Sequence, residues 1–536
     1  MSSPEAGVVL VGLPGSGKTL VGRCLAERTG RRSVDTDELV RHRTGSTPAE
    51  HIARDGEQAF RTLEAEAVAA ACAEPGTIVV TGGGAVLDPL TRWALWHHGT
   101  VAWLDAPPDA LAERLRMDPE PRPLLSALDG PTLSRLADAR RPFYAAADLR
   151  LDSTRDPGDL ATALAEAFAT TGRRARRLYD AQVPRHHPLG PTRARIVYGV
   201  DLGRDTVNSV LDGFPDRRPS LVADRRAADA APRLVAALAP ARRLDITAGE
   251  RAKRLRTVER VVEWLASERA ERGDPLIAFG GGTTGDLAGM AAAVFARGVP
   301  LVHVPTTWLA QADSALGGKV GVDLAGSKNA VGAFWPPVAV LADIGALRSL
   351  PQRRLRDGVA EALKSGLIGD PTLWRLIEAR GRAALRDDEA ARYAITERAA
   401  RLKLDICARD PYETGERRTL NLGHTLGHAL EVESGYRLPH GQAVALGLRA
   451  VASIAAERGA EPHLAERIDD VLSALGFRLR RRFDPSVVRR ALGTDKKRDR
   501  GRQRWILPMA VGRVTEVDDV TDAELAHALR HISEAP

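Results

Sequence analysis

The chain has 536 residues, more than one ordinary domain of about 150 residues requires, which suggests three or four domains. Hydrophobic residues make up 44% and charged residues 27% of it, which excludes a largely disordered chain, and the 4% of aromatic residues disfavours base-stacking surfaces for single-stranded nucleic acid. The net charge of +7 is a dispersed excess of 77 basic over 70 acidic residues, which suits small anionic substrates as well as it suits nucleic acid.

The cysteines and the N-terminus indicate the compartment. Cys24, Cys72 and Cys407 lie far apart, so neither a disulfide framework nor a thiolate zinc site is expected, and a reducing cytoplasm is the expected setting. The first apolar run has no basic region before it and is soon broken by Gly and Pro, unlike a secretory signal. No stretch of about 18 apolar residues occurs, so we expect no membrane partner.

Residues 1–171 are predicted to form one α/β domain. Short apolar runs, VVLVGL, TIVVTGGG and VAWLDA, alternate with helical segments, which predicts a parallel sheet with helices on both faces. Residues 172–192 are rich in Arg, His, Pro and Gly and show little apolar periodicity. We interpret them as a basic, Pro-containing linker rather than a nucleic-acid contact, because no helical face or aromatic pattern accompanies the arginines.

The rest of the chain is predicted to hold two further domains. From residue 193 to 345 the runs ARIVYGVDL, PSLVADRR, RLDITAG, PLIAFGGG and LVHVPTT read as strands between helices, as in a nucleotide-binding α/β domain. From about Leu347 the sequence consists mostly of long helical stretches rich in Ala, Leu, Arg and Glu. Residues 346–536 are therefore expected to form a mostly α-helical domain.

A phosphate-binding loop is predicted at Gly12–Thr19. The string GLPGSGKT fits G-x-x-x-x-G-K-[ST], follows an apolar strand and opens a helix. Its backbone N–H groups would face the phosphates of ATP, Lys18 would add positive charge, and the Thr19 hydroxyl can hold magnesium. Asp35 and Asp37 lie two apart at a predicted strand end, where both carboxylates point the same way and can share magnesium and a substrate hydroxyl.

The motifs that follow this loop make the first half specific. They are FR..E with Phe60, Arg61 and Glu64, GGG from Gly82 to Gly84, RPLL with Arg122, and RRPFY with Arg140. In this order they resemble shikimate kinase over essentially the whole first half. The resemblance implies shikimate held by arginines that clasp its carboxylate and an aspartate that accepts from its hydroxyls, at Asp37, Arg61, Gly83 and Arg140.

The same resemblance assigns the nucleotide site and the reaction. ATP is assigned to Gly15, Ser16, Gly17, Lys18, Thr19, Leu20, Arg122 and Arg155. Magnesium is assigned to Thr19 and, directly or through water, to Asp35. The catalytic residues would be Lys18, Asp37 and Arg122, with Arg122 on a lid that closes over the phosphates. Leu20 stands where the family usually has a second Ser or Thr.

A second set of motifs fills the other half. FGGGTTGDLAG follows a predicted strand, and PTTWLAQADSALGGK, GVAEALK, RRTLNLGHTLGHALE and LPHGQAVALG come after it. In this order they resemble 3-dehydroquinate synthase, which implies one NAD, one divalent metal, zinc or cobalt, and a homodimer formed through this half. Glu361, His424 and His440 would be the metal ligands, a set that leaves a position for substrate oxygens.

His424 and His428 are four residues apart and share a helix face, so both could in principle bind the metal. The resemblance instead assigns His428 to substrate and proton handling. It assigns the reaction to Asp313, Glu361, Lys364, Lys403, Arg417, Asn421 and His428. It assigns NAD to Asp224, Glu250, Lys253, Gly281, Gly282, Thr283, Gly285, Asp286, Thr306, Thr307, Lys319, Lys328, Leu347, Arg348 and Ser349. It assigns the phosphate or carboxylate of the substrate to Arg297, Lys319, Asn329, Lys496 and Lys497.

Two positions depart from the synthase pattern. Gln442 stands where a Glu usually follows the last metal histidine, and Arg226 replaces an Asn near the NAD ribose or adenine. The loss of a carboxylate at Gln442 predicts a looser orientation of His440 and a lower metal affinity. Arg226 predicts an altered NAD affinity.

Together the resemblances imply a bifunctional cytoplasmic enzyme of aromatic precursor synthesis. One half would phosphorylate shikimate with ATP; the other would cyclise 3-deoxy-D-arabino-heptulosonate 7-phosphate to 3-dehydroquinate with loss of phosphate. The two reactions are not consecutive, so direct channelling is not expected. Three alternatives stay open: a sibling sugar phosphate cyclase fused to a polyol kinase, a catalytically impaired half, and a nucleic-acid-binding or regulatory protein with inert catalytic folds.

Overall fold

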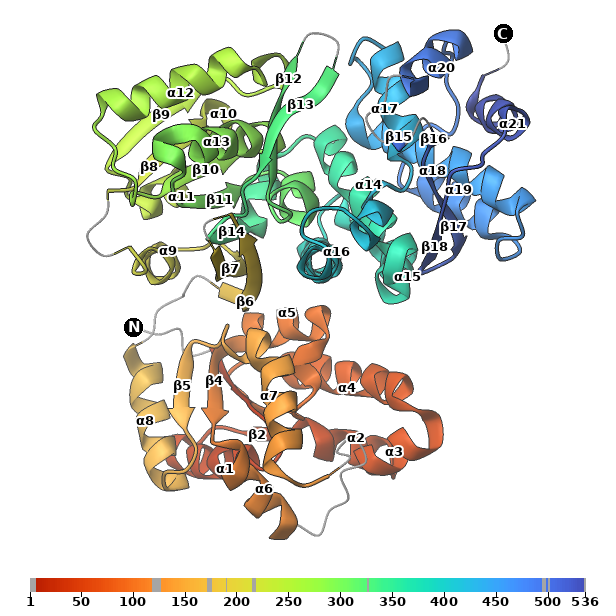
Figure 1. Ribbon diagram of the computed structural model, residues 1–536. Coiled ribbons are helices and arrows are strands. Elements are labelled where there is room, and N and C mark those ends of the chain that lie inside the picture. Colours follow the sequence, from red (N-terminus) through yellow and green to blue (C-terminus); the bar gives the residue numbers. More distant parts are fainter. Residues whose placement is uncertain are drawn as a thin grey trace. The chain divides into compact units, whose positions relative to one another are not determined.

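The computed structural model describes residues 6–117, 127–170, 176–188, 190–214, 218–324, 327–493, 498–499 and 502–534. The predicted sites at Arg122, Lys496 and Lys497 lie outside these ranges. The chain divides into two compact units, Met1–Gln182 with Ile196–Thr206, and Val183–Arg195 with Val207–Pro536. Each unit is described by itself (Figure 1).

Unit 1 is built on a five-stranded parallel sheet, as the alternating pattern predicts. Its strands, in spatial order, are β2 (Ser33–Asp35), β3 (Ile78–Val80), β1 (Gly7–Val11), β4 (Gly99–Asp105) and β5 (Leu149–Asp152). Every residue of β1 is buried, because this central strand pairs on both edges and is covered on both faces. The glycine loop that follows β1 therefore starts from the rigid centre of the sheet.

The helices of unit 1 cover both faces of this sheet. They are α1 (Lys18–Thr29), α2 (Thr36–Thr44), α3 (Pro48–Asp55), α4 (Glu57–Cys72), α5 (Pro89–His98), α6 (Pro108–Met117), α7 (Gly130–Tyr144) and α8 (Pro157–Thr170), with a short 3-10 turn η1 (Ala85–Leu87). Helices α1 and α8 pack together and bury Leu25 and Leu164 against Val8, Leu10 and Val80 of the sheet. Helix α5 packs on β1 and β4. The prediction of a parallel sheet with helices on both faces is confirmed.

The interpretation of residues 172–192 as an irregular linker is wrong over their described part. This segment forms β6 (Arg176–His187) and the start of β7 (Gly190–Val200), two neighbouring strands of a sheet. The segment has no regular alternation of apolar residues, because several of its side chains are polar and make specific contacts. The Arg185 Nε donates to the Pro336 carbonyl at 3.0 Å, and the His187 ring meets Trp335 edge-on at 4.2 Å.

A seven-stranded sheet has the order β6-β7-β14-β11-β10-β8-β9; residues 176–182 of β6 and 196–200 of β7 belong to unit 1, and the other five strands belong to unit 2. Its remaining strands are β8 (Ser220–Asp224), β9 (Arg242–Ile246), β10 (Leu276–Gly280), β11 (Leu301–Pro305) and β14 (Ala339–Asp343), and from β14 to β9 neighbouring strands run parallel. The predicted strand runs are confirmed at β7 to β11. A hairpin of β12 (Lys319–Leu324) and β13 (Ser327–Phe334) forms a separate two-stranded sheet that was not expected.

Helices surround this sheet: α9 (Arg204–Leu211), α10 (Arg225–Ala230), α11 (Pro232–Leu238), α12 (Leu255–Ser267) and α13 (Gly282–Val294), with the short turns η2 (Glu250–Ala252), η3 (Phe295–Arg297), η4 (Ala310–Ser314) and η5 (Ile344–Ser349). The core between α12, α13 and the strands contains Val261, Leu265, Leu287 and Ala291. Helix α13 packs on both β10 and β12, so it joins the sheet to the hairpin.

The remainder of unit 2 is mostly helical, as predicted. It contains α14 (Gln352–Gly369), α15 (Pro371–Ala384), α16 (Glu389–Arg409), η6 (Glu416–Asn421), α17 (His424–Glu433), α18 (His440–Glu457), α19 (Leu464–Ala474), α20 (Pro485–Gly493) and α21 (Asp522–Ile532). Four short strands were not expected: β15 (Arg498–Asp499), β16 (Arg502–Gln503), β17 (Trp505–Ala510) and β18 (Arg513–Val517). Helix α18 is central, because it packs against α14, α17, α19 and α21. None of the described helices combines the length and apolar content that a membrane crossing requires.

The crossing of α17 and α18 depends on Gly447. A Cβ at this position would overlap the carbonyl oxygen of Gly423, the residue that precedes α17. We expect Gly447→Ala to destabilise the protein by about 2 kcal/mol, because a backbone-to-backbone contact has no side chain that can yield. Thermal unfolding measures this loss. Gly493→Ala, in α20 and facing open space, is the matched control and should leave the melting temperature unchanged or raised; equal effects of the two changes would refute this account.

Candidate active sites

The phosphate-binding loop of unit 1 joins β1 to α1. Gly15 and Gly17 have φ of 79° and 78°, a left-handed backbone that other residues adopt only with strain. Because α1 begins at Lys18, the unpaired N–H groups of its first turn face the same space as the loop. The Lys18 Nζ folds back over the loop and donates to the carbonyls of Gly12 at 3.0 Å and Leu13 at 2.9 Å. The loop has the form of an anion cradle with a positive charge inside it.

Asp35 and Asp37 make different contacts in the structure. Strand β2 ends at Asp35 and α2 starts at Thr36, so the expected strand alternation stops one residue too early. The Asp35 carboxylate accepts from the Thr19 hydroxyl at 2.8 Å and from the Asp37 N–H at 3.0 Å, and so caps α2. The Asp37 side chain instead lies beside Gly82. Asp35 thus lies beside the Thr19 hydroxyl and Asp37 beside the Gly82–Gly84 turn, and the sharing of one magnesium by the two carboxylates stays a prediction.

The Gly82–Gly84 turn collects the residues assigned to shikimate. A Cβ on Gly82 would lie 2.6 Å from the Asp37 carboxylate, and one on Gly83 would lie 3.1 Å from the Arg140 guanidinium. A Cβ on Gly84 would overlap the guanidinium of Arg61. Asp37, Arg61, Gly83 and Arg140 thus converge on one turn whose glycines are required by close approach.

Tyr144 and Glu64, which sequence reasoning left without a role, support this turn and its arginines. Arg140 Nη1 and Tyr144 Oη both donate to the Gly83 carbonyl, at 2.8 and 2.6 Å. Burial raises the pKa of Tyr144 to about 12, so its hydroxyl stays a donor at neutral pH. Glu64 accepts from Arg61 Nη1 at 2.7 Å; burial raises the pKa of this carboxyl although Arg61 opposes the shift.

Leu20 and Arg155, which were assigned to the nucleotide, both have exposed side chains. Arg114, which has no motif around it, contacts the loop, because its Nη1 and Nη2 donate to the carbonyls of Gly15 at 3.3 Å and Ser153 at 2.8 Å. Only the fold, which brings α6 beside the loop, reveals this arginine.

Unit 2 has a second glycine turn after its strand β10. Gly281 caps α13, which starts at Gly282, and the Thr306 N–H donates to the Gly280 carbonyl at 2.9 Å. The Thr307 side chain occupies the space that a Cβ on Gly281 would need. A pocket opens here, lined by Gly280, Gly281, Gly282, Gly285, Asp286, His303, Pro305, Ala310, Ser314, Ala315 and Lys319. Helix N-terminus and glycine turn together suit a dinucleotide pyrophosphate.

Charged residues assigned to NAD gather beside this turn. Lys253 Nζ lies 2.5 Å from both the Asp286 carboxylate and the Asn329 side-chain oxygen. Burial raises the pKa of Asp286, and the Lys253 ammonium opposes that shift. Lys328 pairs with Glu250 at 2.8 Å. These contacts tie the β12–β13 hairpin to the strand ends.

Other predicted NAD residues have local contacts. Asp224 ends β8 and caps α10 by accepting from the Arg226 N–H at 3.1 Å. Thr283 belongs to the first turn of α13. The turn η5 holds Leu347, Arg348 and Ser349; Leu347 is buried, and Arg348 pairs with Glu389. Arg297, assigned to the substrate anion, is exposed on η3 and is not among the residues that line the glycine-turn pocket.

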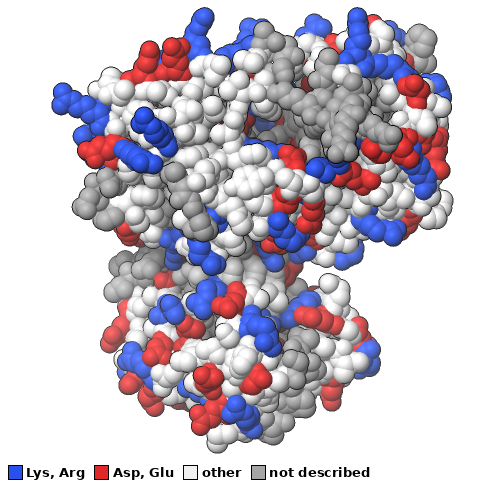
Figure 2. Space-filling model, in the orientation of Figure 1, with Lys and Arg blue, Asp and Glu red and all other residues white. Residues whose placement is uncertain are grey.

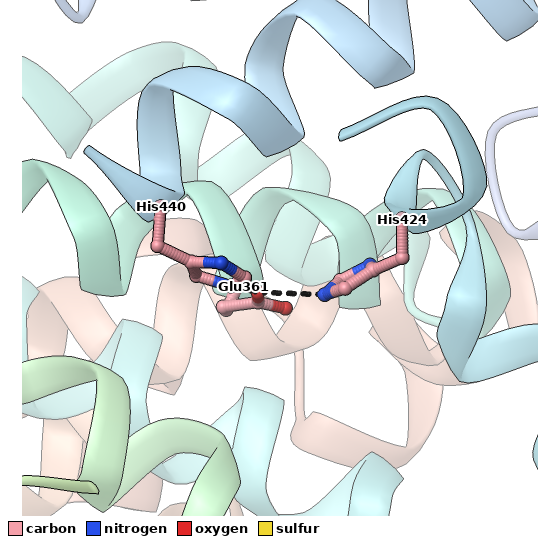
Figure 3. A group of neighbouring side chains, drawn as sticks. All are labelled: Glu361, His424 and His440. Carbon is pink, nitrogen blue, oxygen red and sulfur yellow. Dashed lines mark hydrogen bonds and ion pairs between the residues drawn. The ribbon is translucent and has the colours of Figure 1, made fainter. Parts of the chain in front are cut away.

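The three predicted metal ligands converge from three helices. Glu361 lies in α14, and His424 and His440 are the first residues of α17 and α18 (Figure 3). Their ligand atoms all lie within 4.8 Å of one another. Glu361 Oε1 is 3.1 Å from His424 Nε2 and 2.8 Å from His440 Nε2. One carboxylate and two imidazoles form a donor set that suits catalytic zinc.

The outer nitrogens of both histidines are held in place. His424 Nδ1 lies 3.1 Å from the Leu422 carbonyl, and His440 Nδ1 lies 3.2 Å from Glu431 Oε1, so both Nε2 atoms face Glu361. Burial opposes the charge on Glu361, but Lys364 and the two histidines outweigh it and hold the pKa of this carboxyl well below its usual value. The anion that a metal requires is therefore preformed.

The expectation that Gln442 loosens His440 assumes that residue 442 orients this histidine. In the structure the Gln442 side chain has another partner. The Gln442 side chain turns to the backbone of Arg478, donating to its carbonyl at 2.7 Å and accepting from its N–H at 3.0 Å. The carboxylate that orients His440 is Glu431, from the LNLGHTLGHALE motif. Sequence spacing could not show which of these two side chains reaches the imidazole.

A cationic cluster lies beside the metal ligands. Asp313 pairs with Lys403 at 2.9 Å and lies 3.9 Å from Lys364, which in turn pairs with Glu361 at 2.5 Å. The His428 ring meets the His424 ring edge-on, with centroids 5.3 Å apart. His428 does not belong to the converging group of Glu361, His424 and His440. The role of His428 in substrate and proton handling stays a prediction.

Glu413 is a site residue that sequence reasoning missed. Asn421 Nδ2 donates to its carboxylate at 2.7 Å, and Lys319 pairs with the same carboxylate. Its φ of 60° is held by Asp410, which accepts from the N–H groups of Thr414, Gly415 and Arg417 at 2.7 to 3.0 Å. These hydrogen bonds overcome burial and lower the pKa of Asp410 to about 2. The D-x-x-E-x-G-x-R spacing was the available signal.

Comparison with known proteins decides the family. Residues 243–357 match the family model of the 3-dehydroquinate synthase N-terminal domain, and residues 358–498 match that of its C-terminal domain. A 3-dehydroquinate synthase of Xanthomonas campestris pv. campestris (strain 8004) is 43% identical over 295 residues, which cover 53% of this chain and 80% of that protein. The chain belongs to the 3-dehydroquinate synthase family. Residues 14–169 match the family model of shikimate kinase.

Solved structures agree with the fold of unit 2. The 2-epi-5-epi-valiolone synthase of Streptomyces hygroscopicus subsp. jinggangensis 5008, with NAD+ and Zn2+ bound, is 29% identical with a TM-score of 0.60, covering 65% of this chain and 99% of that one. A 2-deoxy-scyllo-inosose synthase complexed with carbaglucose-6-phosphate, NAD+ and Co2+ is 27% identical with a TM-score of 0.57, covering 66% and 99%. The chain is thus an enzyme that joins a shikimate kinase domain to a synthase of this family.

The orientation of His440 by Glu431 is testable through metal affinity. We expect Glu431→Gln to weaken zinc binding by about tenfold, because the acceptor that fixes the imidazole loses its charge. Competition against a chelator, followed by metal content, measures this without any assay of turnover. Gln442→Glu restores the residue usual in the family and is the matched control. It should change zinc affinity less than about threefold; a larger effect than that of Glu431→Gln would show that residue 442 orients the ligand after all.

Proposed function

We propose that the chain carries two independent active sites of the shikimate pathway. Unit 1 phosphorylates shikimate to shikimate 3-phosphate with ATP and magnesium. Unit 2 converts 3-deoxy-D-arabino-heptulosonate 7-phosphate to 3-dehydroquinate with NAD and a divalent metal. The observation that carries the second activity is the convergence of Glu361, His424 and His440 beside a glycine turn in a member of this family. The first activity rests on two features. The phosphate loop suits ATP, and the residues assigned to shikimate converge on the Gly82–Gly84 turn.

In the kinase the chain's residues divide into two groups. Lys18 and the N-terminus of α1 hold the ATP phosphates, and Thr19 with Asp35 holds magnesium, as their 2.8 Å contact supports. Asp37 accepts the proton of the attacking shikimate hydroxyl. Arg61 and Arg140 clasp the shikimate carboxylate, since both guanidinium groups border the same glycine turn. Positioning and charge, with little covalent chemistry, supply the rate.

In the synthase NAD would accept and return a hydride, and zinc would polarise a substrate hydroxyl and carbonyl. Glu361, His424 and His440 would hold the metal, and the pocket beside Gly281 and Gly282 would hold the dinucleotide.

The chain's own residues around this centre bind and move protons. Lys364 and Lys403 flank Asp313, Arg417 and Lys403 both lie beside Gly317, and these cations balance the negative charge of the substrate. Asn421 and Lys319 face the same space through their shared contact with Glu413. His428 lies one helical turn from His424 and would take or return a proton near the reacting ring.

Two further proposals concern the setting of the enzyme. We propose a homodimer formed through unit 2, which rests on the family resemblance. We also propose that it works in the cytoplasm, which its three cysteines support, since Cys24, Cys72 and Cys407 are all free thiols.

Separate point changes test the independence of the two sites. Lys18→Ala removes the positive charge of the phosphate loop, and we expect it to lower shikimate phosphorylation at least about 100-fold while phosphate release from the heptulosonate substrate is unchanged. His424→Ala should have the reverse effect, because it removes a metal ligand. Assays of both reactions on wild type and both variants check this. If either change abolished both activities, the two-site proposal would fall.

A substrate panel distinguishes 3-dehydroquinate synthesis from the reactions of sibling cyclases. The similarity to the valiolone and inosose synthases keeps that second candidate in view. We expect phosphate release from the heptulosonate phosphate and none from an uncarboxylated sugar phosphate such as glucose 6-phosphate. The reason is that three cations, Lys319, Lys403 and Arg417, lie near one another in this half, and a carboxylate on the substrate adds a negative charge that such a cluster binds. Faster turnover of glucose 6-phosphate would favour the sibling reaction.

A further inference from the structure

A fully buried arginine lies behind the acceptor side of unit 1. Arg92, in α5, has 0% of its surface exposed. Burying a guanidinium is costly unless its donors are satisfied, and here they meet backbone carbonyls. Its Nε donates to the Leu178 carbonyl at 3.1 Å, and its Nη1 donates to the carbonyl of Val86. Its guanidinium also lies over the Phe143 ring, 4.4 Å from the centroid.

Two of these contacts reach the segments that shape the shikimate turn. Val86 lies in η1, directly after Gly82–Gly84. Phe143 lies in α7 between Arg140 and Tyr144, whose side chains both donate to the Gly83 carbonyl. Arg92 therefore contacts the backbone that follows the turn and the helix that holds the turn from the other side.

The third contact leads beyond the kinase match. The shikimate kinase family model ends at residue 169, whereas Leu178 lies in β6 and is fully buried within unit 1. The next residue, Tyr179, packs its ring against Phe143 with centroids 5.8 Å apart. Arg177 Nη2 donates to the Ala147 carbonyl, just after α7, at 3.2 Å. Three consecutive residues of β6 thus contact the elements behind the acceptor site.

We infer that Arg92 is a positioning residue that ties the shikimate turn to strand β6, so that the hairpin outside the kinase match completes the acceptor site. This inference rests on the proposed shikimate kinase activity. A guanidinium has donors on opposite sides and can hold two carbonyls from different segments at once, whereas a lysine ammonium on the same stem cannot span both. The Gly82–Gly84 turn is then held in register by α7 on one side and by β6, through Arg92, on the other.

Steady-state kinetics of the full chain test the positioning role. We expect Arg92→Lys to raise the KM for shikimate about three- to tenfold, with the KM for ATP and the rate of the synthase reaction within about twofold of wild type. Tyr179→Ala should act in the same direction, because it removes the ring packing of β6 on Phe143. An equal rise in both KM values would overturn the inference, since it would indicate general loosening of the domain.

Arg242→Lys is the matched control for these variants. Arg242 is a buried arginine in β9 of unit 2 that also donates to backbone carbonyls, those of Glu268 at 3.0 Å and Arg218 at 2.9 Å. Its replacement should cost comparable stability, yet leave the KM for shikimate unchanged. A similar rise in that KM would refute a specific role for Arg92.

Hydrogen exchange supplies a readout that does not depend on turnover. In wild-type protein, shikimate should slow exchange of the amides of residues 176–182 several-fold, and magnesium–ADP alone should not. In Arg92→Lys the same amides should no longer respond, although those of residues 82–86 still do. Protection of 82–86 without 176–182 in wild type would overturn the inference. Wild-type protein that phosphorylates no shikimate would instead refute the proposed function.

Discussion

The first N–H groups of a helix have no partners within the helix, and both active sites of this chain depend on leaving them free. In each unit a glycine turn leads from the carboxyl end of a buried parallel strand into such a helix, from β1 into α1 and from β10 into α13. Positive charge then gathers where an anion must sit, as Lys18 in one unit and Lys253 and Lys319 in the other. Figure 2 shows the wider surface, where basic and acidic side chains are interspersed.

The metal site shows how a buried carboxylate organises a helical region. Glu361 lies between two histidines on one side and Lys364 on the other, so its charge is balanced from both directions. Because the histidines begin α17 and α18 and the carboxylate lies within α14, the mutual placement of three helices sets the ligand geometry. The close crossing at Gly423 and Gly447 is part of that geometry, since Gly423 directly precedes His424.

Much of this could be predicted because it depends on residue type and spacing. The strands of both sheets follow from short apolar runs, and the phosphate loop and the metal triad follow from motifs that carry their own chemistry. The hairpin strand β6 could not be predicted, because Arg185 and His187 contact groups far away in the sequence. These groups are the Pro336 carbonyl and the Trp335 ring. The contacts of Arg92 and of Gln442 could not be predicted for the same reason, since only the folded chain shows which polar group each side chain meets.

The Asp410 carboxylate has a consequence for how the synthase site responds to pH. A carboxyl whose pKa falls on folding stabilises the fold above its unfolded value and loses that contribution only as the pH drops towards the folded value, here about 2. In the turn that presents Glu413, Asp410 therefore stays an ionised acceptor for its three N–H donors across the range in which an enzyme is assayed. Asp410 thus serves as a fixed acceptor, and titration seen near neutrality in this half has to come from other groups.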